Sequence, residues 1–119
     1  MNNKGLEFED YISRRIGKTE EHASTTIRSG GVHDDEDVKT RNYLIQCKYD
    51  ERRDNFIITK KDWDKLSSNV IKNPNQDGNY RTGIFAVKNK SRDIIVAISL
   101  EDFLAMVEKI NHKEDNNEE

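Results

Sequence analysis

Three polar side chains in the middle of the chain have the types and spacing of a metal-dependent phosphodiesterase site. Asp37 begins a short β-like segment, and Gln46 and Lys48 lie two residues apart in the next one. Alternate residues of a strand face the same side of a sheet, so Gln46 and Lys48 share one face. Ile45 and Cys47 then lie on the other face, which we expect to pack into a core.

These residue types suit the hydrolysis of a phosphodiester, which needs a cation, an activated water and a stabilised leaving oxygen. Asp37 and Gln46 offer oxygen ligands of the kind that Mg²⁺ prefers, and the backbone carbonyl of Cys47 can add another. Lys48 can orient or deprotonate the attacking water, or stabilise developing charge. A solvated strand with ordinary polar alternation is the alternative interpretation of this pattern.

The sequence over residues 5–17 predicts an amphipathic helix, and its acidic residue Glu9 lies beside the apolar stripe. A carboxylate directed toward a sheet is costly unless something pairs with it. A metal ion shared with Asp37 would be such a partner, and a salt bridge to Arg28 or Lys48 is the alternative. The helix therefore offers a further candidate ligand for the same site.

Four segments of the chain together resemble the archaeal-type Holliday junction resolvases and the related small resolvase-like proteins of bacteriophages. They are KGLEFE at 4–9, TIRSGG at 26–31, DV at 37–38 and LIQCK at 44–48. These proteins belong to the PD-(D/E)xK, or restriction-endonuclease-like, superfamily. Their metal site uses a glutamate of the first helix, an aspartate at a strand start and a glutamate-x-lysine pair on the next strand. The resemblance covers roughly residues 4–66.

The resemblance implies a Mg²⁺-dependent endodeoxyribonuclease of DNA recombination and repair, in which Mn²⁺ can substitute. Carried over by position, the site residues are Glu9, Asp37, Gln46 and Lys48, with Ser29 as the serine of the glycine-rich loop near the site. The implied substrate is branched DNA, preferably a four-way junction, and the implied source is a bacterium or phage. Two symmetric cuts need two sites related by a two-fold axis, so we expect a homodimer.

Two positions depart from the family pattern. Glu36 stands where a proline often precedes the aspartate, and Gln46 stands where a glutamate is usual. Glutamine offers one neutral oxygen and no charge, so metal affinity should fall. Two alternatives therefore stay open, a nuclease of the same fold that acts on flapped, nicked or linear DNA, and a catalytically degenerate DNA-binding relative.

Basic side chains around the site are the expected contacts to DNA phosphates. They are Arg28, Lys39, Arg41, Arg52, Arg53, Lys60 and Lys61. An ordinary solvated charged face is the alternative. His33 and the acids that follow it can also bind a metal, although a polar loop is the preferred interpretation of that segment.

Length and composition indicate one small domain with a lean core. The chain has 119 residues, of which 33% are hydrophobic and 36% charged, and its net charge is −3. Residues 113–119 are expected to form an acidic disordered tail after a single domain over 1–112. Without the tail's one lysine and four acids, 19 basic and 19 acidic residues remain, so the domain body is neutral.

Periodicity predicts helices and strands that form one mixed α/β fold, a central mixed sheet flanked by helices. The resemblance implies that this core is restriction-endonuclease-like. The predicted strands are 25–28, 37–40, 43–49, 83–87 and 93–98. Thr59 and Asp62 predict a capping box that starts the second helix, and Ser99 is the expected cap of the last one. The last helix has an apolar face, and periodicity leaves open whether this face lies in the core or in an interface.

The sequence shows no apolar run long enough for a membrane span and no apolar core of a secretory signal at its start. Cys47 is the only cysteine, so no internal disulfide can form. We therefore expect a cytoplasmic protein with no membrane partner.

Overall fold

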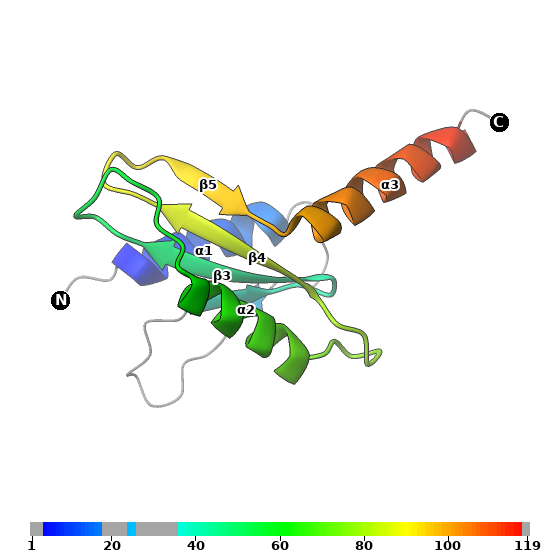
Figure 1. The fold of residues 1–119 in the computed structure, drawn as a ribbon, viewed down its shortest axis with the longest axis horizontal. Coiled ribbons are helices and arrows are strands. Elements are labelled where there is room, and N and C mark those ends of the chain that lie inside the picture. The colour runs from blue at the N-terminus through cyan, green and yellow to red at the C-terminus, as the bar shows by residue number, and fades with distance from the viewer. Residues whose placement is uncertain (1–3, 18–23, 26–35, 118–119) are drawn as a thin grey trace.

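The computed structural model describes residues 4–17, 24–25 and 36–117, with the side chains of 7–17 and 38–112. Its elements follow the order α1 (Lys4–Gly17), β1 (Ser24–Thr25), β2 (Glu36–Lys39), β3 (Tyr43–Tyr49), α2 (Lys60–Lys72), β4 (Thr82–Lys88), β5 (Ile94–Ala97) and α3 (Leu100–Asn117). The strands form one sheet in the order β1-β2-β3-β4-β5 (Figure 1). The predicted mixed α/β architecture is confirmed at this level.

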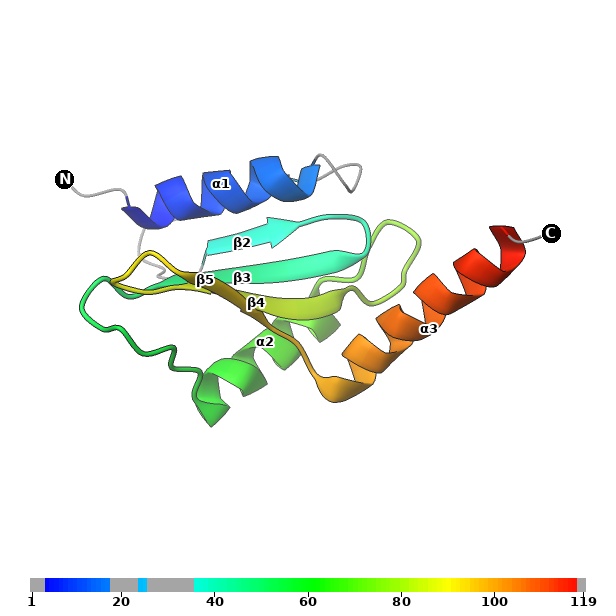
Figure 2. The same cartoon turned by 90° about the horizontal axis from the view of Figure 1, so that it is seen from above.

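The sheet is mixed because β3 and β4 run parallel, while β1–β2, β2–β3 and β4–β5 are antiparallel. Parallel neighbours need a crossover connection, and α2 supplies it between β3 and β4. Helix α1 covers one face of the sheet and α2 covers the other (Figure 2). The central strand β3 is therefore enclosed between two helical layers.

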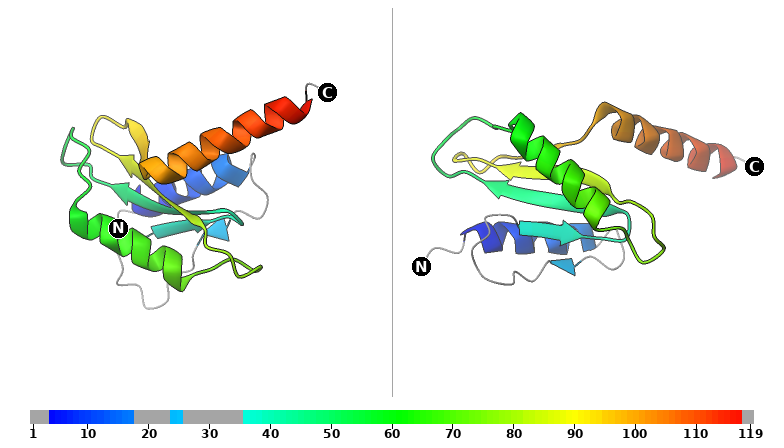
Figure 3. Two further views of the ribbon diagram at one scale, coloured as in Figure 1. Left: turned by 45° about the vertical axis from the view of Figure 1, so that its right-hand side comes forward. Right: turned by 60° about the horizontal axis from the view of Figure 1, so that its bottom comes forward.

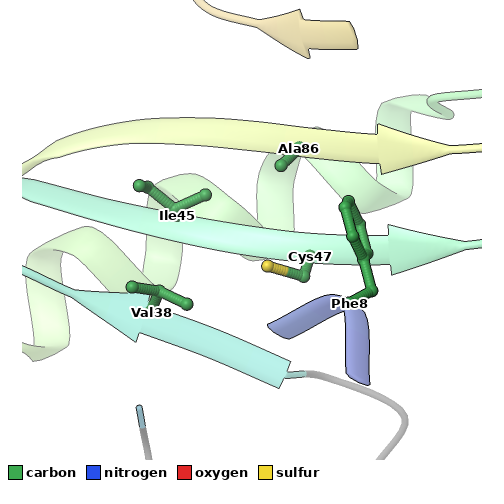
Figure 4. Close-up of a cluster of buried hydrophobic side chains, with 5 residues drawn as sticks. All are labelled: Phe8, Val38, Ile45, Cys47 and Ala86. Carbon is green, nitrogen blue, oxygen red and sulfur yellow. The ribbon is translucent and has the colours of Figure 1, made fainter. Parts of the chain in front are cut away.

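Two clusters of apolar side chains hold these layers together, and β3 contributes to both. Under α1, Phe8 packs with Val38, Ile45, Cys47 and Ala86 (Figure 4). Under α2, the buried cluster is Leu44, Leu66, Phe85 and Val87. Odd-numbered β3 residues thus face α1 and even-numbered residues face α2, which is the strand alternation that the sequence predicts.

Helix α2 is fixed at its start and along its length. The predicted capping box is confirmed: the Thr59 hydroxyl accepts from the backbone N–H of Asp62, and the Asp62 carboxylate accepts from the backbone N–H of Thr59. Gly83 of β4 lets the helix approach closely, because a Cβ built there would lie 2.9 Å from Val70 Cγ2 and 3.1 Å from Leu66 Cγ. The cap fixes where α2 begins, and Gly83 lets the later turns of the helix lie close to β4.

Element boundaries agree with the predicted ones to within a few residues, with one exception at each end of the chain. The first strand is Ser24–Thr25 in the structure, and the rest of the strand predicted over 25–28 lies outside the described residues. Helix α3 runs on to Asn117, so residues 113–117 are helical where composition predicted a disordered tail. Lysine, glutamate and aspartate can prolong a helix that is already nucleated, even where they could not start one.

Helix α3 projects away from the sheet and its two covering helices (Figure 3). Its predicted apolar face is exposed: the relative exposures are 67% for Leu100, 50% for Phe103, 48% for Leu104 and 57% for Ile110. That face is therefore not part of the core of this chain. Among the helices that the structure describes, none has the length and apolar character needed to cross a membrane.

Candidate functional site

The β2–β3 ladder brings three of the predicted site residues together. Asp37 is directly opposite Gln46 in the antiparallel register, and Lys48 follows on the same face of β3. Residues opposite each other in a ladder lie on the same face of the sheet. The side chain of Asp37 lies outside the described ones, so its place in the site comes from the backbone register alone.

Gln46 lies in the interior of the protein, with 5% of its surface exposed. Its Oε1 atom is buried and accepts no hydrogen bond from the described part of the chain, although the residue takes part in a further interaction. A buried amide oxygen next to the position of a carboxylate is a suitable pair of ligands for a hard cation. The donor types at this point of the sheet therefore fit Mg²⁺ or Mn²⁺.

Glu9 is also buried, with 2% exposed, but it belongs to the other helical layer. It follows Phe8 on α1, which packs on the face of Ile45 and Cys47, whereas Gln46 faces α2. Helix α1 and strand β2 start at the same end of the molecule (Figure 2), and Glu9 is in the second turn of α1. A ligand role for Glu9 would therefore require its carboxylate to reach past the beginning of β2.

Lys48 is held by two acceptors at the start of α2. Its Nζ donates to Asp62 Oδ2 at 2.5 Å and to the backbone carbonyl of Ile57 at 3.2 Å, and its side chain is 36% exposed. Both bonds are donated by the ammonium group. The Lys48 ammonium is therefore held in one orientation, two residues from Gln46 on the same strand.

Asp62 is the residue of this site that sequence reasoning missed, because the capping box alone accounted for it. Its carboxylate accepts both from Lys48 and, at 3.0 Å, from the backbone N–H of Thr59. Burial acts to raise the pKa of Asp62, but the hydrogen bonds from Lys48 and the Thr59 backbone outweigh it, so the pKa is lowered. The acid is therefore charged at neutral pH and part of the electrostatics of the site.

We expect Asp62→Asn to lower the free energy of unfolding by about 1–2 kcal/mol at neutral pH, because a charge-assisted hydrogen bond is lost. A lowered pKa stabilises the fold above the unfolded-state pKa, and this contribution is lost as pH falls through the folded value. The difference between wild type and variant should therefore shrink in urea titrations below about pH 4. A difference that is the same at pH 3 and pH 7 would contradict this account.

The matched control for that variant is Asp64→Asn, two residues further along α2. Asp64 pairs with Lys60 at 2.6 Å, but the two side chains are 60% and 84% exposed. Exposed pairs of this kind contribute little to stability, so we expect a change within about 0.5 kcal/mol at any pH. A larger effect here than at position 62 would show that exposed charge, rather than the contact with Lys48, governs the stability of α2.

The basic residues predicted to contact DNA stand at the surface, mostly within ion pairs. Arg52 and Arg53, with 81% and 55% of their side chains exposed, both pair with Asp50. The pKa of Asp50 is lowered, first by the hydrogen bond from the Arg52 backbone. Lys60 pairs with Asp64 as described above, and Lys61 is exposed on the first turn of α2. These pairs are accessible and can exchange their carboxylate for a phosphate.

The other two described basic candidates lie at the opposite end of β3. Arg41 pairs with Asp77 at 2.5 Å, and Lys39 Nζ lies 3.4 Å from Asn73 Oδ1. Tyr43 begins β3 and Tyr49 ends it, so Lys39 and Arg41 lie far along the strand from Arg52. The predicted DNA contacts therefore form two groups rather than one patch.

The turn between β4 and β5, which was not among the predicted site features, supports the Arg52–Arg53 group. The backbone N–H of Lys90 donates to the Arg53 carbonyl at 2.8 Å, and Asn89 Nδ2 donates to the Asp54 carbonyl at 2.6 Å. These bonds join the β4–β5 turn to the loop after β3. Arg92 in that turn has a left-handed backbone with φ 66°, a conformation in which glycine is more usual.

Several predicted site features cannot be placed or stand apart from the site. Ser29, Arg28 and the His33 loop lie outside the described residues. The side chain of Cys47 is 6% exposed and packs in the core under α1, as predicted. Its backbone is in the ladder between β2 and β4, where its register partners are Glu36 and Ala86.

Among the side chains that the structure describes, no group of three or more His, Cys, Asp or Glu residues is arranged to hold a metal ion. The side chain of Asp37 is not among the described ones, so this finding does not include it. No protein-family model, curated protein or solved structure matches this chain.

Proposed function

We propose that the chain is a metal-dependent endodeoxyribonuclease that hydrolyses phosphodiester bonds in branched DNA, preferably at four-way junctions, and that it works as a homodimer. Its sheet would be a restriction-endonuclease-like core in the cytoplasm of a bacterium or a phage-infected cell. The observation that carries the proposal is the β2–β3 register. It sets Asp37 opposite the buried Gln46, with Lys48 on the same face.

The groups that would hold Mg²⁺, or Mn²⁺ in its place, are the Asp37 carboxylate and the Gln46 amide oxygen. The Cys47 carbonyl is a further oxygen donor, in register with Glu36 at the beginning of β2, whereas the buried Glu9 carboxylate belongs to the α1 layer on the other face of the sheet. When bound, the cation supplies charge neutralisation at the phosphate and lowers the pKa of a bound water. A neutral amide in place of a carboxylate weakens the binding of the cation but still provides an oxygen ligand.

Lys48 contributes a positive charge that is already oriented before substrate arrives. Its ammonium is fixed by Asp62 and by the Ile57 carbonyl, so little reorganisation is needed when negative charge develops on the scissile phosphate. A DNA phosphate that approaches this face would accept a hydrogen bond from the Lys48 ammonium, which also donates to Asp62. We therefore assign Lys48 to stabilisation of the developing charge and Asp62 to its positioning.

Substrate binding would use the exposed cations that flank this face. Arg52 and Arg53 stand on the loop that follows β3, and Lys60 and Lys61 begin α2. Contacts of this kind position a duplex without reading its sequence. A substrate recognised by its branched shape suits such a set of contacts.

A catalytically degenerate DNA-binding relative is the second candidate, and two observations favour it. Gln46 lacks the charge of a glutamate, and Lys48 is engaged by Asp62 rather than free to meet a phosphate. In this case the Arg52–Arg53 loop would bind DNA and the β2–β3 face would do no chemistry. Both candidates are expected to bind DNA, but only the nuclease is expected to cleave it.

The deciding experiment incubates the full chain with labelled four-way, flapped, nicked and linear DNA, in Mg²⁺, in Mn²⁺ and in chelator. We expect paired symmetric nicks on the four-way junction, lost with chelator. Equal cleavage of all four substrates would support the nuclease proposal but contradict the preference for four-way junctions. Binding without cleavage in either metal would overturn the nuclease proposal in favour of the degenerate relative.

A further inference from the structure

The apolar face of α3 is a surface that the proposed site does not use. Leu100, Phe103, Leu104 and Ile110 are each about half exposed or more, on a helix that projects from the body (Figure 1). Single exposed apolar residues are ordinary on protein surfaces, but a contiguous set on one helix face marks an interaction site. Together with the half-buried Val107, these four residues fall within one arc of the helical wheel.

Over its first three turns this helix places its large apolar residues and its charged residues on different arcs, with the small Ala105 on the charged side. Glu101, Asp102, Glu108 and Lys109 all lie on the arc opposite the apolar face. Depletion of charge at the centre of a patch is the compositional signal of a protein interface. The face is therefore suited to bury against another apolar surface, and not to bind nucleic acid.

The spacing of the face is symmetric along the helix. Leu100, Phe103, Val107 and Ile110 are three, four and three residues apart, so the pattern reads the same from either end. This is the seam spacing of paired helices. A helix with such a pattern presents matching residues to an antiparallel copy of itself, with Phe103 at the level of Val107 of the partner subunit.

The exposed area is of the size that a stable dimer needs. The four exposed side chains leave roughly 450 Å² of apolar surface per copy, at about 200 Å² for a fully exposed large side chain. Since homodimer interfaces are about 65% apolar, this corresponds to roughly 700 Å² of interface per copy. Stable interfaces bury about 800 Å² per partner.

We propose that α3 pairs with α3 of a second copy of this chain, antiparallel, about a two-fold axis near the middle of Phe103–Val107. The shape of the chain favours the antiparallel direction. The body is attached at the start of α3 (Figure 2). The molecule measures 55 × 31 × 28 Å. Paired helix axes lie about 8–10 Å apart, so a parallel pair would crowd two bodies at one end, whereas an antiparallel pair separates them.

This proposal stands on the exposed face of α3 and does not depend on nuclease activity. A homodimer is already expected from the proposed function. This proposal names the surface through which the two chains pair, which is neither the β2–β3 face nor the basic loops. Mass measurement tests the pairing and cleavage assays test the site, so either can fail without the other. A dimer that cleaves nothing would leave this proposal intact.

The first test measures the molar mass of the full chain by light scattering over a range of concentrations. We expect twice the chain mass of 13.9 kDa for the wild type, and 13.9 kDa for Phe103→Lys and for Val107→Glu. Each substitution occurs twice in the dimer, so we expect dissociation constants to rise on the order of a hundredfold or more. The control is Ile71→Glu, because Ile71 is a comparably exposed apolar residue, 62%, on α2, and this variant should stay dimeric.

The second test mixes the two monomeric variants. In the antiparallel pair, the lysine introduced by Phe103→Lys would meet the glutamate introduced by Val107→Glu in the other chain, while the second Phe103–Val107 contact is kept. We expect the mixture to form a mixed dimer that neither variant forms alone, with circular dichroism confirming that both are folded. A wild-type chain that stays at 13.9 kDa at every concentration overturns the proposal. A wild-type dimer that the mixture does not restore overturns the antiparallel register.

Discussion

Replacing Asp37 by alanine should lower the rate of DNA cleavage by at least about a thousandfold and leave the fold intact. Asp37 is the only carboxylate that the ladder register sets directly opposite Gln46. Without it the site loses the carboxylate opposite Gln46, and with it the charge that would hold a divalent cation there. The measurement is single-turnover cleavage of a labelled four-way junction in Mg²⁺, with circular dichroism to confirm folding.

The matched control is Glu36→Ala, the neighbouring carboxylate on the same strand. Glu36 pairs with Cys47 in the register, so strand alternation assigns it to the face that α1 covers. We expect this variant to cleave at a rate within a few-fold of wild type. Metal-dependent cleavage that persists in Asp37→Ala, or that is lost equally in Glu36→Ala, would remove Asp37 from the site.

The same Asp37→Ala variant should bind DNA more tightly than wild type when chelator is present. An aspartate without its cation repels phosphates, and the alanine removes that repulsion. Fluorescence anisotropy with a labelled junction at fixed ionic strength measures the effect, since phosphate contacts depend strongly on salt. Weaker binding by the variant would indicate that Asp37 supports the structure of the binding face rather than a metal.

Gln46→Glu should lower the Mg²⁺ concentration for half-maximal cleavage by about tenfold or more, because it adds a charged ligand opposite Asp37. Like charges directly opposite each other in a ladder are destabilising. The variant should therefore have a lower Tm than wild type in chelator and regain it when Mg²⁺ is added. Wild type should show a smaller metal-dependent shift in Tm.

Gln76→Glu is the control for the added charge, because Gln76 is an exposed residue of the loop between α2 and β4. Its Tm should not depend on Mg²⁺. If Gln46→Glu behaves like this control, the amide of Gln46 does not take part in a metal site. If Gln46→Glu cleaves DNA and the wild type does not, the chain as it stands is the degenerate relative.

Local signals in the sequence predict most of the fold, since strands and caps leave short-range patterns. The alternation around Gln46 predicts which β3 residues face which layer, and both apolar clusters agree with it. Thr59 and Asp62 predict the start of α2 because a capping box involves residues only three apart. The pairing of Asp37 with Gln46 follows from two strands joined by a tight turn.

Contacts between distant elements could not be predicted in the same way. The bond from Lys48 to Asp62 depends on where α2 docks, which Gly83 and the apolar cluster under α2 determine. The sequence also shows that Glu9 lies beside an apolar stripe, but not which face of the sheet that stripe covers. In the structure it covers the face opposite Gln46.

Helix α3 shows the limit of periodicity most clearly. Its apolar face is evident from the spacing of Leu100, Phe103 and Val107, yet spacing is the same for a core helix and for an interface helix. Only the position of the helix relative to the body separates the two. The exposure of Phe103 and its neighbours excludes the face from the core of the chain, and we propose that it forms an interface.

The most direct test of the central claim, that Asp37 and Gln46 belong to one metal site, is a Mn²⁺ titration followed by the EPR signal of free Mn²⁺. It compares wild type with Asp37→Ala, Gln46→Ala and Glu36→Ala. We predict that wild type and Glu36→Ala bind Mn²⁺ alike, and that the other two variants bind at least about tenfold more weakly. Binding that is absent in wild type, or unchanged in Asp37→Ala, would contradict the claim.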